Sequence, residues 1–278
     1  MKTKLLALLL ALALCLTLAA CGAPAPTDAA DDPTPAGEGD PVEPGDSDLA
    51  YVTDKGTLII GYTVFPPMNY TDAEGNFTGF DTELAQIICE KLGVEPDFVV
   101  IDWSFKEFEL QSKQIDVIWN GLTINEERKK DMDFTVPYLQ NAQVLVMRED
   151  AEYTDTSSLL DKTVVAEMGS AGEKTVQEDE NLSQTDYIPL GKQTDCLMEV
   201  AGGTSHAAVI DRTLAKSATG PGTDFSGLAI KDELSVEFYG IGFRLGSDIT
   251  TAVNAILAEL KADGTLDSLA AKYNLELA

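Results

Sequence analysis

The sequence predicts an α/β fold in which strands alternate with helices and form two lobes. Short apolar runs that end in glycine or polar residues are typical of buried strands. Segments with apolar residues at helical spacing follow several of these runs, and the alternation starts again after residue 150. This alternation favours a mainly parallel sheet covered on both faces. Residues 50–278 are long enough for two lobes of roughly a hundred residues each.

The first lobe is predicted to contain a helix between Asp81 and Gly93. Asp81 can cap its first turn and Gly93 can end its last one. The apolar residues between them, among them Leu84, Ile88 and Leu92, recur at helical spacing. Other apolar runs predict buried strands at residues 57–60, 99–101 and 117–119.

After Asp150 the alternation of strands and helices is predicted to start again. Apolar runs at residues 162–166 and 207–210 predict two more strands. A tight turn at residues 169–172 leads into a helix that starts near Glu173. Near the end of the chain, a helical stripe of apolar residues stops at Gly264.

The composition excludes several classes of protein. The formal net charge is −28, whereas nucleic-acid binding needs a basic face, so we expect no nucleic-acid partner. A single histidine argues against a His-based zinc site or a Ser-His-Asp enzyme, and we expect no metal and no cofactor. Four cysteines are too few for a disulfide scaffold. We expect a monomer with free, buried thiols at Cys89 and Cys196.

Residues 1–20 are predicted to be a lipoprotein export signal. Lys2 and Lys4 precede an apolar run that is too short to span a membrane comfortably. Leu18-Ala19-Ala20-Cys21 resembles a bacterial lipobox, in which the cysteine is lipidated and the chain is cut just before it. The alternative is an ordinary signal with an incidental cysteine. A lipid on Cys21 would hold the protein at a membrane.

Residues 21–49 are predicted to be a disordered tether that follows the lipidated cysteine. This stretch holds six of the twelve prolines and is rich in glycine and acidic residues. Such a composition cannot bury enough apolar surface to offset the entropy lost on ordering. The tether is expected to lift the folded part away from the membrane.

The segment from Asn120 to Arg128 follows the third predicted strand, and ligands bind beyond the carboxyl ends of strands in such sheets. Gly121 lets a ligand approach the backbone, and Thr123 offers a hydroxyl. The planar guanidinium of Arg128 can hold a carboxylate through two parallel hydrogen bonds. Taken alone, Arg128 also fits a surface ion pair with Glu126.

Five ordered motifs resemble the polar amino-acid-binding proteins of bacterial ABC importers, which are extracellular solute-binding proteins of family 3. The motifs are Phe65-Pro66-Pro67, Gly79-Phe80-Asp81, Gln114-Ile115-Asp116-Val117, Gly121 to Arg128 and Asp133-Phe134-Thr135-Val136-Pro137-Tyr138. The resemblance implies a periplasmic-binding-protein-like type II fold, with two α/β lobes joined by a two-strand hinge. Lobe 1 would comprise residues 50–141 and 241–278, and lobe 2 residues 142–240.

The same resemblance implies which residues hold the two charged ends of an amino acid. Arg128 would grip the α-carboxylate, assisted by Thr123 and by the main chain near Gly121. Ser170 lies in the second-lobe turn that closes over the carboxylate in this family. Asp211 would accept the α-ammonium, although it also fits a helix cap.

The ligand side chain would lie between Phe65 and Trp103, with Tyr62 lining its pocket. For Phe65 and Trp103, packing in the core is the alternative. The resemblance leaves open which amino acid is bound.

The function implied is capture of a free amino acid outside the cytoplasmic membrane, by lobe closure, and its delivery to an ABC transporter permease. Two alternatives remain open at this point. One is an enzyme on the same fold, resembling cyclohexadienyl dehydratases, for which His206 and Glu167 are the candidate acid–base residues. The other is a sensory subunit that reports the ligand to a separate receptor.

Overall fold

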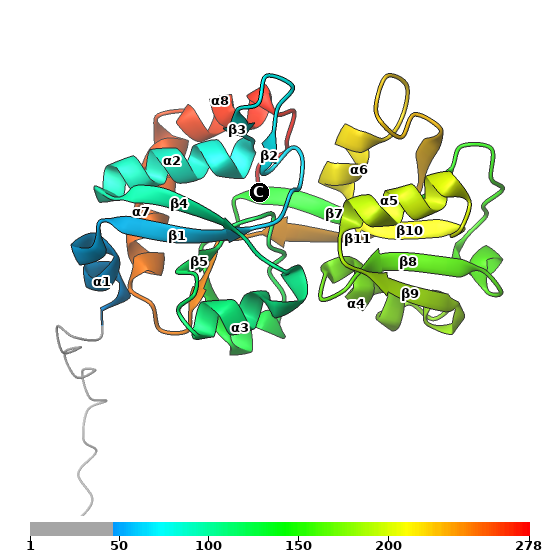
Figure 1. Cartoon of the computed structure of the whole chain (residues 1–278), viewed down its shortest axis with the longest axis horizontal. Helices are drawn as coiled ribbons and strands as arrows, with labels where there is room; N and C mark the ends of the chain where they lie inside the picture. Colours follow the sequence, from blue (N-terminus) through cyan, green and yellow to red (C-terminus); the bar gives the residue numbers. More distant parts are fainter. Residues whose placement is uncertain (1–46) are drawn as a thin grey trace, which may run out of the picture. The chain divides into compact units, whose positions relative to one another are not determined.

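The computed structural model describes residues 47–278 (Figure 1). The predicted signal, the lipidation site Cys21 and the tether up to residue 46 lie outside the described residues. The predicted end of the tether at residue 49 is wrong, because helix α1 (Asp48–Lys55) already begins there. Ser47 caps this helix by accepting the backbone N–H of Ala50 at 2.9 Å. Such a cap satisfies a donor that would otherwise lack a partner.

The first sheet has five strands in the order β4-β1-β5-β12-β6. Strand β1 (Thr57–Tyr62) lies parallel to both β4 (Glu95–Val100) and β5 (Val117–Ile118). Strand β12 (Gly242–Arg244) runs antiparallel to β5 and to β6 (Met132–Phe134). The C-terminal part of the chain therefore returns to complete the first lobe.

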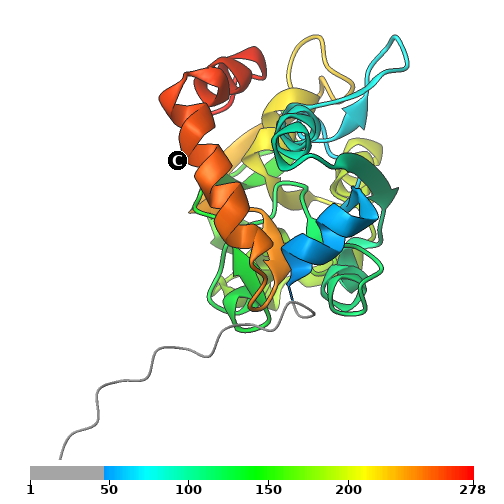
Figure 2. The same cartoon turned by 90° about the vertical axis from the view of Figure 1, so that its left-hand side faces the viewer.

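Helices α2 (Phe80–Leu92), α7 (Ile249–Ala262) and α8 (Thr265–Lys272) pack together on this sheet. Helix α3 (Lys106–Gln111) lies on the other side in Figure 1. Figure 2 shows α1 beside the start of α7, where Asp248 accepts the backbone N–H of Leu49 at 2.8 Å. The short strands β2 and β3, at Tyr70–Thr71 and Phe77–Thr78, form a separate hairpin.

The second sheet also has five strands, in the order β11-β7-β10-β8-β9. Strands β8 (Thr163–Glu167), β9 (Asp186–Leu190) and β10 (Ala207–Asp211) are parallel. Strand β7 (Leu139–Arg148) runs antiparallel to β10 and to β11 (Leu228–Tyr239). Three helices complete this lobe: α4 (Ala171–Glu178), α5 (Gln193–Gly202) and α6 (Arg212–Ala218).

Two long antiparallel strands, β7 and β11, link the lobes. At the first-lobe end of this pair, Tyr239 forms a β-bridge with Thr123 and Leu139 forms one with Leu277. The prediction of two α/β lobes is confirmed. The sheets are mixed, however, and not mainly parallel. The linking strands β7 and β11, and also β12, are antiparallel to their neighbours.

Among residues 47–278, four short 3₁₀ segments complete the secondary structure, at Trp103–Phe105, Arg128–Lys130, Thr156–Leu159 and Leu182–Gln184. The expected cap at Asp81 is wrong, because Gly79 occupies the N-cap position of α2. Asp81 instead lies buried in the first lobe and accepts the Gly121 N–H at 2.7 Å and the Tyr138 hydroxyl at 2.9 Å. Cys89 and Cys196 are free and buried, as predicted.

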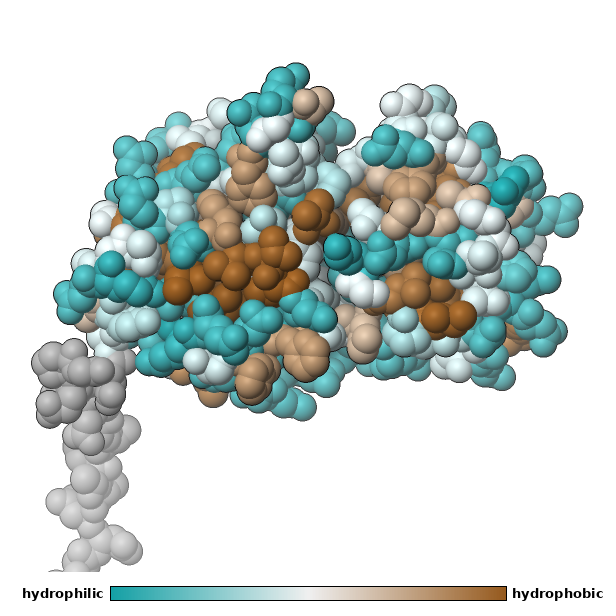
Figure 3. All heavy atoms as spheres, viewed as in Figure 1, coloured by the Kyte–Doolittle hydropathy of each residue, from teal (hydrophilic) through white to brown (hydrophobic). Residues whose placement is uncertain are grey.

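Apolar side chains gather on the face of the first lobe shown in Figure 3. Strand β4 is the edge strand of its sheet, and Val100 at its end is 62% exposed. Phe105 and Phe108 are also exposed.

Between residues 47 and 278 no helix has both the length and the apolar character needed to cross a membrane.

Candidate ligand-binding site

Residues that follow β1, β5 and β8 or end β10 meet at one small cavity, which is lined from both lobes. Its volume is about 10 Å³, which is room for about one water molecule. The structure brings eight of the nine predicted site residues to its wall: Phe65, Trp103, Asn120, Gly121, Thr123, Arg128, Ser170 and Asp211. An amino acid could enter only if the lobes separated.

Arg128 comes from the first lobe and is only 8% exposed. Its Nη1 donates to the Thr123 carbonyl oxygen at 2.8 Å, and its Nη2 donates across the lobes to the Gly169 carbonyl oxygen at 3.0 Å. Burial lowers the pKa of Arg128, while Glu107, Glu237 and Asp211 favour its charged form. Its hydrogen-bond partners are two neutral carbonyl oxygens, and its Nε lies 4.0 Å from a Glu107 carboxylate oxygen. This desolvated guanidinium can still bind a ligand carboxylate.

Asp211 ends β10 in the second lobe and is 5% exposed. Its Oδ1 accepts from Asn141 at 2.6 Å, Gln143 at 3.0 Å and Tyr239 at 2.7 Å. Gln193 donates to its Oδ2. Although Asp211 is the N-cap residue of α6, its side chain makes no capping bond. The carboxylate is therefore held rigidly at the cavity and does not serve as a helix cap.

Helix α4 starts at the same cavity. Ser170 is its N-cap residue, and the Ser170 hydroxyl oxygen accepts the Glu173 N–H at 3.1 Å. Ala171, the first residue of the helix, also lines the cavity. Backbone N–H groups in a first turn lack intrahelical partners and favour an anion. The α4 N-terminus thus adds to the anion-binding capacity of Arg128.

Phe65 and Trp103 supply the aromatic part of the wall. A side chain at Gly121 would place its Cβ 2.6 Å from a ring carbon of Phe65, so only glycine lets this ring lie so close to the backbone. Gly121 also has a positive φ of 58°, which glycine adopts without strain. The turn after β5 therefore fixes the position of Phe65.

Three more of the predicted residues, Asn120, Gly121 and Thr123, also have partners within the protein. Asn120 exchanges hydrogen bonds with Thr63 and Asn69. The Gly121 N–H donates to Asp81, so it has no hydrogen left for a ligand. The Thr123 hydroxyl donates to Glu237 at 2.8 Å. These residues build the cavity wall and position Arg128.

Tyr62 is the one predicted site residue that does not line the cavity. Its ring packs against Phe77, with centroids 4.8 Å apart, and against Phe98 at 6.1 Å. Successive side chains of an extended chain point in opposite directions. Tyr62 and the next residue therefore cannot both face the cavity. Thr63, the next residue, lines the cavity instead.

Sequence reasoning did not assign Gln193, Glu237 or Glu167 to the binding site. Gln193 begins α5 and lines the cavity, where it donates to Asp211. Glu237 lies on β11 and accepts from Asn141 at 2.7 Å and from Gln143 at 2.9 Å. Glu167 ends β8, lines the cavity and is 4% exposed. For Glu167 the signal was present, since it ends a predicted strand just before the glycine turn.

Burial shapes the protonation of this cluster of acids. Burial, together with repulsion from Asp211, raises the pKa of Glu167 to about 8 and that of Glu237 to about 8. Burial also raises the pKa of Asp211, although its hydrogen-bond donors oppose the shift. In the first lobe, burial raises the pKa of Asp81 to about 7.

These shifts predict how stability depends on pH without added ligand. A carboxyl whose folded pKa is raised stabilises the fold fully below its unfolded pKa and loses this contribution as pH rises through the folded pKa. For Glu167 and Glu237 the loss falls between about pH 4.5 and 8. Each of the two groups should lose stability on the order of 1 kcal/mol or more over this range. The melting temperature should therefore fall by roughly 4–8 °C from pH 5 to pH 8.

Differential scanning calorimetry across this range is the measurement. Glu167→Gln should reduce the decrease, whereas Glu74→Gln, at an exposed turn, should leave it unchanged. Lys106 does not interfere, because burial lowers its pKa to about 8 and its effect on stability lies above that pH. A melting temperature that rises from pH 5 to pH 8 would contradict the prediction.

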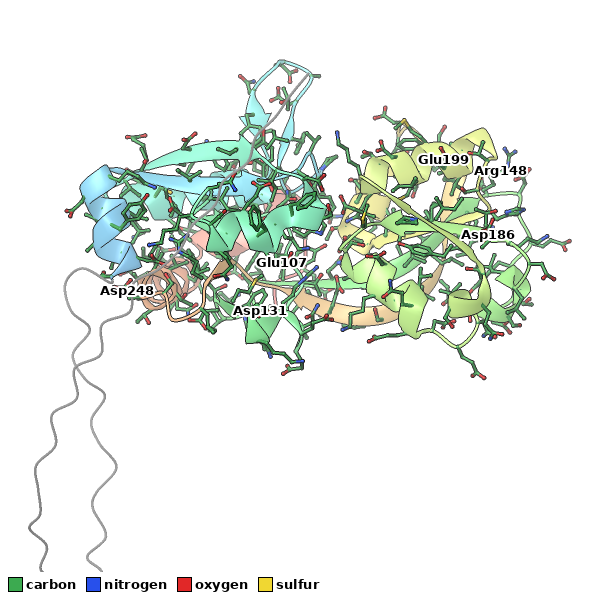
Figure 4. All side chains as sticks on the ribbon, turned by 60° about the horizontal axis from the view of Figure 1, so that its bottom comes forward. Glu107, Asp131, Arg148, Asp186, Glu199 and Asp248 are labelled. Carbon is green, nitrogen blue, oxygen red and sulfur yellow. The ribbon has the colours of Figure 1, made fainter. Side chains whose placement is uncertain are left out.

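Several direct contacts hold the lobes together beside the cavity. Lys106 Nζ in the first lobe donates to the Gly169 carbonyl oxygen at 2.9 Å, and Lys174 pairs with Glu127 at 2.9 Å. A second, outer cavity of about 350 Å³ is lined in part by the residues that make these contacts. Arg128 lines both cavities, and Glu107 and Asp131, labelled in Figure 4, line the outer one. Ser170 also lines both, so the outer cavity adjoins the inner one at Arg128 and Ser170.

The described residues contain no group of three or more histidine, cysteine, aspartate or glutamate side chains placed to hold a metal ion. His206, one of the two candidate acid–base residues, is exposed, and its Nδ1 accepts the Thr163 N–H at 3.1 Å. Only Glu167, the other candidate, lies at the cavity. The chemistry that the site offers is charge pairing and hydrogen bonding.

Three known proteins place this arrangement in context. The L-cystine-binding protein TcyJ of Escherichia coli K12 is 32% identical over 81% of this chain and 85% of its own. A crystal structure of a mutant of ArgBP from T. maritima matches with a TM-score of 0.74 and 33% identity, over 81% of this chain and 98% of that one.

The third is the ancestral amino-acid-binding protein AncCDT-1, described as a precursor of cyclohexadienyl dehydratase. It matches with a TM-score of 0.75 and 28% identity, over 82% of this chain and 99% of that one. These neighbours confirm the type II periplasmic-binding-protein fold. The family model for bacterial extracellular solute-binding proteins of family 3 matches residues 58–276. The chain thus belongs to family 3 of the bacterial extracellular solute-binding proteins.

Proposed function

We propose that this protein captures a free α-amino acid outside the cytoplasmic membrane and delivers it to an ABC transporter permease. The observation that carries the proposal is the position of Arg128 and Asp211, which come from opposite lobes and line one cavity. The guanidinium would bind the α-carboxylate, together with the start of α4. The Asp211 carboxylate would bind the α-ammonium.

Lobe closure follows from the cost of burying charge. Both ends of an amino acid lose water when the lobes close, and each end needs a partner to offset this loss. Only the closed form offers Arg128 and Asp211 to the same ligand, so the ligand stabilises closure. We place the hinge near residues 141–143 and 238–241, in the linking strands, and the lobe boundaries at 141/142 and 240/241. Opening would break the Arg128–Gly169 bond and make room for the ligand.

The site of action is proposed from the N-terminal sequence. A lipid on Cys21 would anchor the chain at the extracytoplasmic face of the membrane, and the acidic tether would leave the lobes free to reach the permease. The closed lobes would present the surface that the permease recognises. The protein would act as a monomer.

Calorimetry with the twenty common amino acids tests this function. At least one should bind with a dissociation constant well below millimolar. Asp211→Asn should weaken its binding by at least about 30-fold, because the buried ammonium loses its charge partner. Asp150→Asn, an exposed change in the same lobe, should have no effect.

Two outcomes would contradict the proposal. One is the absence of binding to any of these amino acids. The other is turnover of prephenate or arogenate by the purified protein, which would favour the enzymatic alternative.

A further inference from the structure

The charges on the cavity wall do not balance for a neutral amino acid. The wall carries one guanidinium, that of Arg128, and two carboxylates, those of Glu167 and Asp211. A zwitterion brings one carboxylate for Arg128 and one ammonium for Asp211. A neutral amino acid then has no positive group left to pair with Glu167.

The protein itself does not neutralise Glu167. Among residues 47–278, no cation lies within 4 Å of its carboxylate. The neighbouring Gln193 amide, which donates to Asp211, opposes the rise in the pKa of Glu167. Asp211, in contrast, accepts from four side chains. A carboxylate has about four acceptor sites, so Glu167 retains unused capacity.

The charged groups near Glu167 leave its carboxyl without a cation of its own. Lys106 favours the charged form of Glu167, but its ammonium is engaged by the carbonyl oxygens of Trp103 and Gly169 and by Glu107 at 3.1 Å. Asp211 and Asp102 add repulsion, and burial together with this repulsion raises the pKa of the Glu167 carboxyl to about 8. An incoming positive charge would therefore favour the ionised form of this buried carboxyl.

The remaining walls suit an apolar stem that ends in a cation. Phe65 and Trp103 provide aromatic surface, which attracts guanidinium and ammonium groups as well as methylene chains. The Lys106 ammonium already lies 4.8 Å from the centre of a Trp103 ring. An aromatic wall facing a carboxylate is therefore a fitting environment for a basic side chain.

We propose that the ligand is an α-amino acid with a cationic side chain, and that Glu167 determines this specificity by pairing with the side-chain charge. The inference rests on the proposed function, since Arg128 and Asp211 must hold the α-groups. It adds a role for Glu167 that the α-groups do not require.

Calorimetry with arginine and citrulline tests the role of Glu167 separately from the binding of the α-groups. Citrulline has nearly the same shape as arginine but carries a neutral urea group. Wild-type protein should bind arginine at least 10-fold more tightly than citrulline, and lysine at least 10-fold more tightly than norleucine. In Glu167→Gln both preferences should fall to within about threefold, through weaker binding of arginine and lysine.

The matched control is Glu178→Gln, which removes one negative charge from an exposed position on α4 in the same lobe. It should retain both preferences. The inference is overturned if Glu167→Gln keeps the wild-type preference, or if wild-type protein binds citrulline or other neutral amino acids at least as tightly as arginine. That second result would leave the proposed function intact, whereas failure to bind any amino acid would overturn both.

Discussion

Replacing Arg128 with alanine should weaken amino-acid binding by at least about 100-fold. The ligand carboxylate would be buried in the closed form with the α4 N-terminus as its main partner, and a helix N-terminus alone contributes only about 0.3–1 kcal/mol. Arg128 also donates to the Thr123 and Gly169 carbonyl oxygens, so the variant would lose one bond that joins the lobes. Calorimetry with the best wild-type ligand gives the change in affinity.

Two further variants test whether charge or geometry matters at this position. Arg128→Lys keeps the charge but cannot form two parallel hydrogen bonds, so its affinity should fall between those of wild type and Arg128→Ala. Lys130→Ala removes an exposed cation two residues away and should bind normally. Unchanged affinity in a folded Arg128→Ala protein would contradict the site, and circular dichroism establishes folding independently.

The sequence was sufficient to predict where the site lies. Strand patterns placed the loops that carry Phe65, Arg128 and Ser170 at strand ends, and the end of β10 identified Asp211. Side chains at the ends of neighbouring strands meet because the strands share a sheet edge. The structure brings these four residues to one cavity. Local pattern and the family resemblance together supplied this part of the result.

The orientation of individual side chains was harder to predict. Tyr62 and Thr63 are adjacent, and a shift of one residue exchanges the side chain that faces the cavity for the one that packs against Phe77. Likewise, the Gly121 N–H lies in a loop that lines the cavity, but it donates to Asp81, which is forty residues away in sequence. Such a contact depends on tertiary packing, which a local pattern does not contain.

The acidic cluster could not be predicted for the same reason. Glu237 lies on a strand whose charged residues look solvated, yet it meets Thr123 from the first lobe and Asn141 from the other linking strand. The tether boundary shows the complementary error. Residues 47–49 resemble the preceding acidic segment in composition, but Asp248, about two hundred residues later, accepts hydrogen bonds from Ser47 and Leu49.

The second large effect is expected at Arg244, whose replacement by methionine should reduce the free energy of unfolding by about 3–5 kcal/mol. Its Nε donates to Asp48 at 2.9 Å, and its Nη1 donates to the Ile115 carbonyl oxygen at 3.0 Å. Its Nη2 lies 3.6 Å from Asp116, which is fully buried. Methionine fills much of the same volume but leaves the Asp116 charge with Lys55 as its one remaining cation.

Urea unfolding followed by circular dichroism measures this loss. For comparison, Arg148→Met breaks an exposed pair with Asp150 and should change stability by less than about 1 kcal/mol. A double variant tests the cause: if the loss comes from the Asp116 carboxylate, which keeps only one of its two cations, then adding Asp116→Asn to Arg244→Met should restore part of the stability. If Asp116→Asn instead adds its full cost to that of Arg244→Met, the two residues act independently and the buried pair does not explain the effect. The same network joins α1 to β12 through Asp48, so its loss should release the first helix before the sheet.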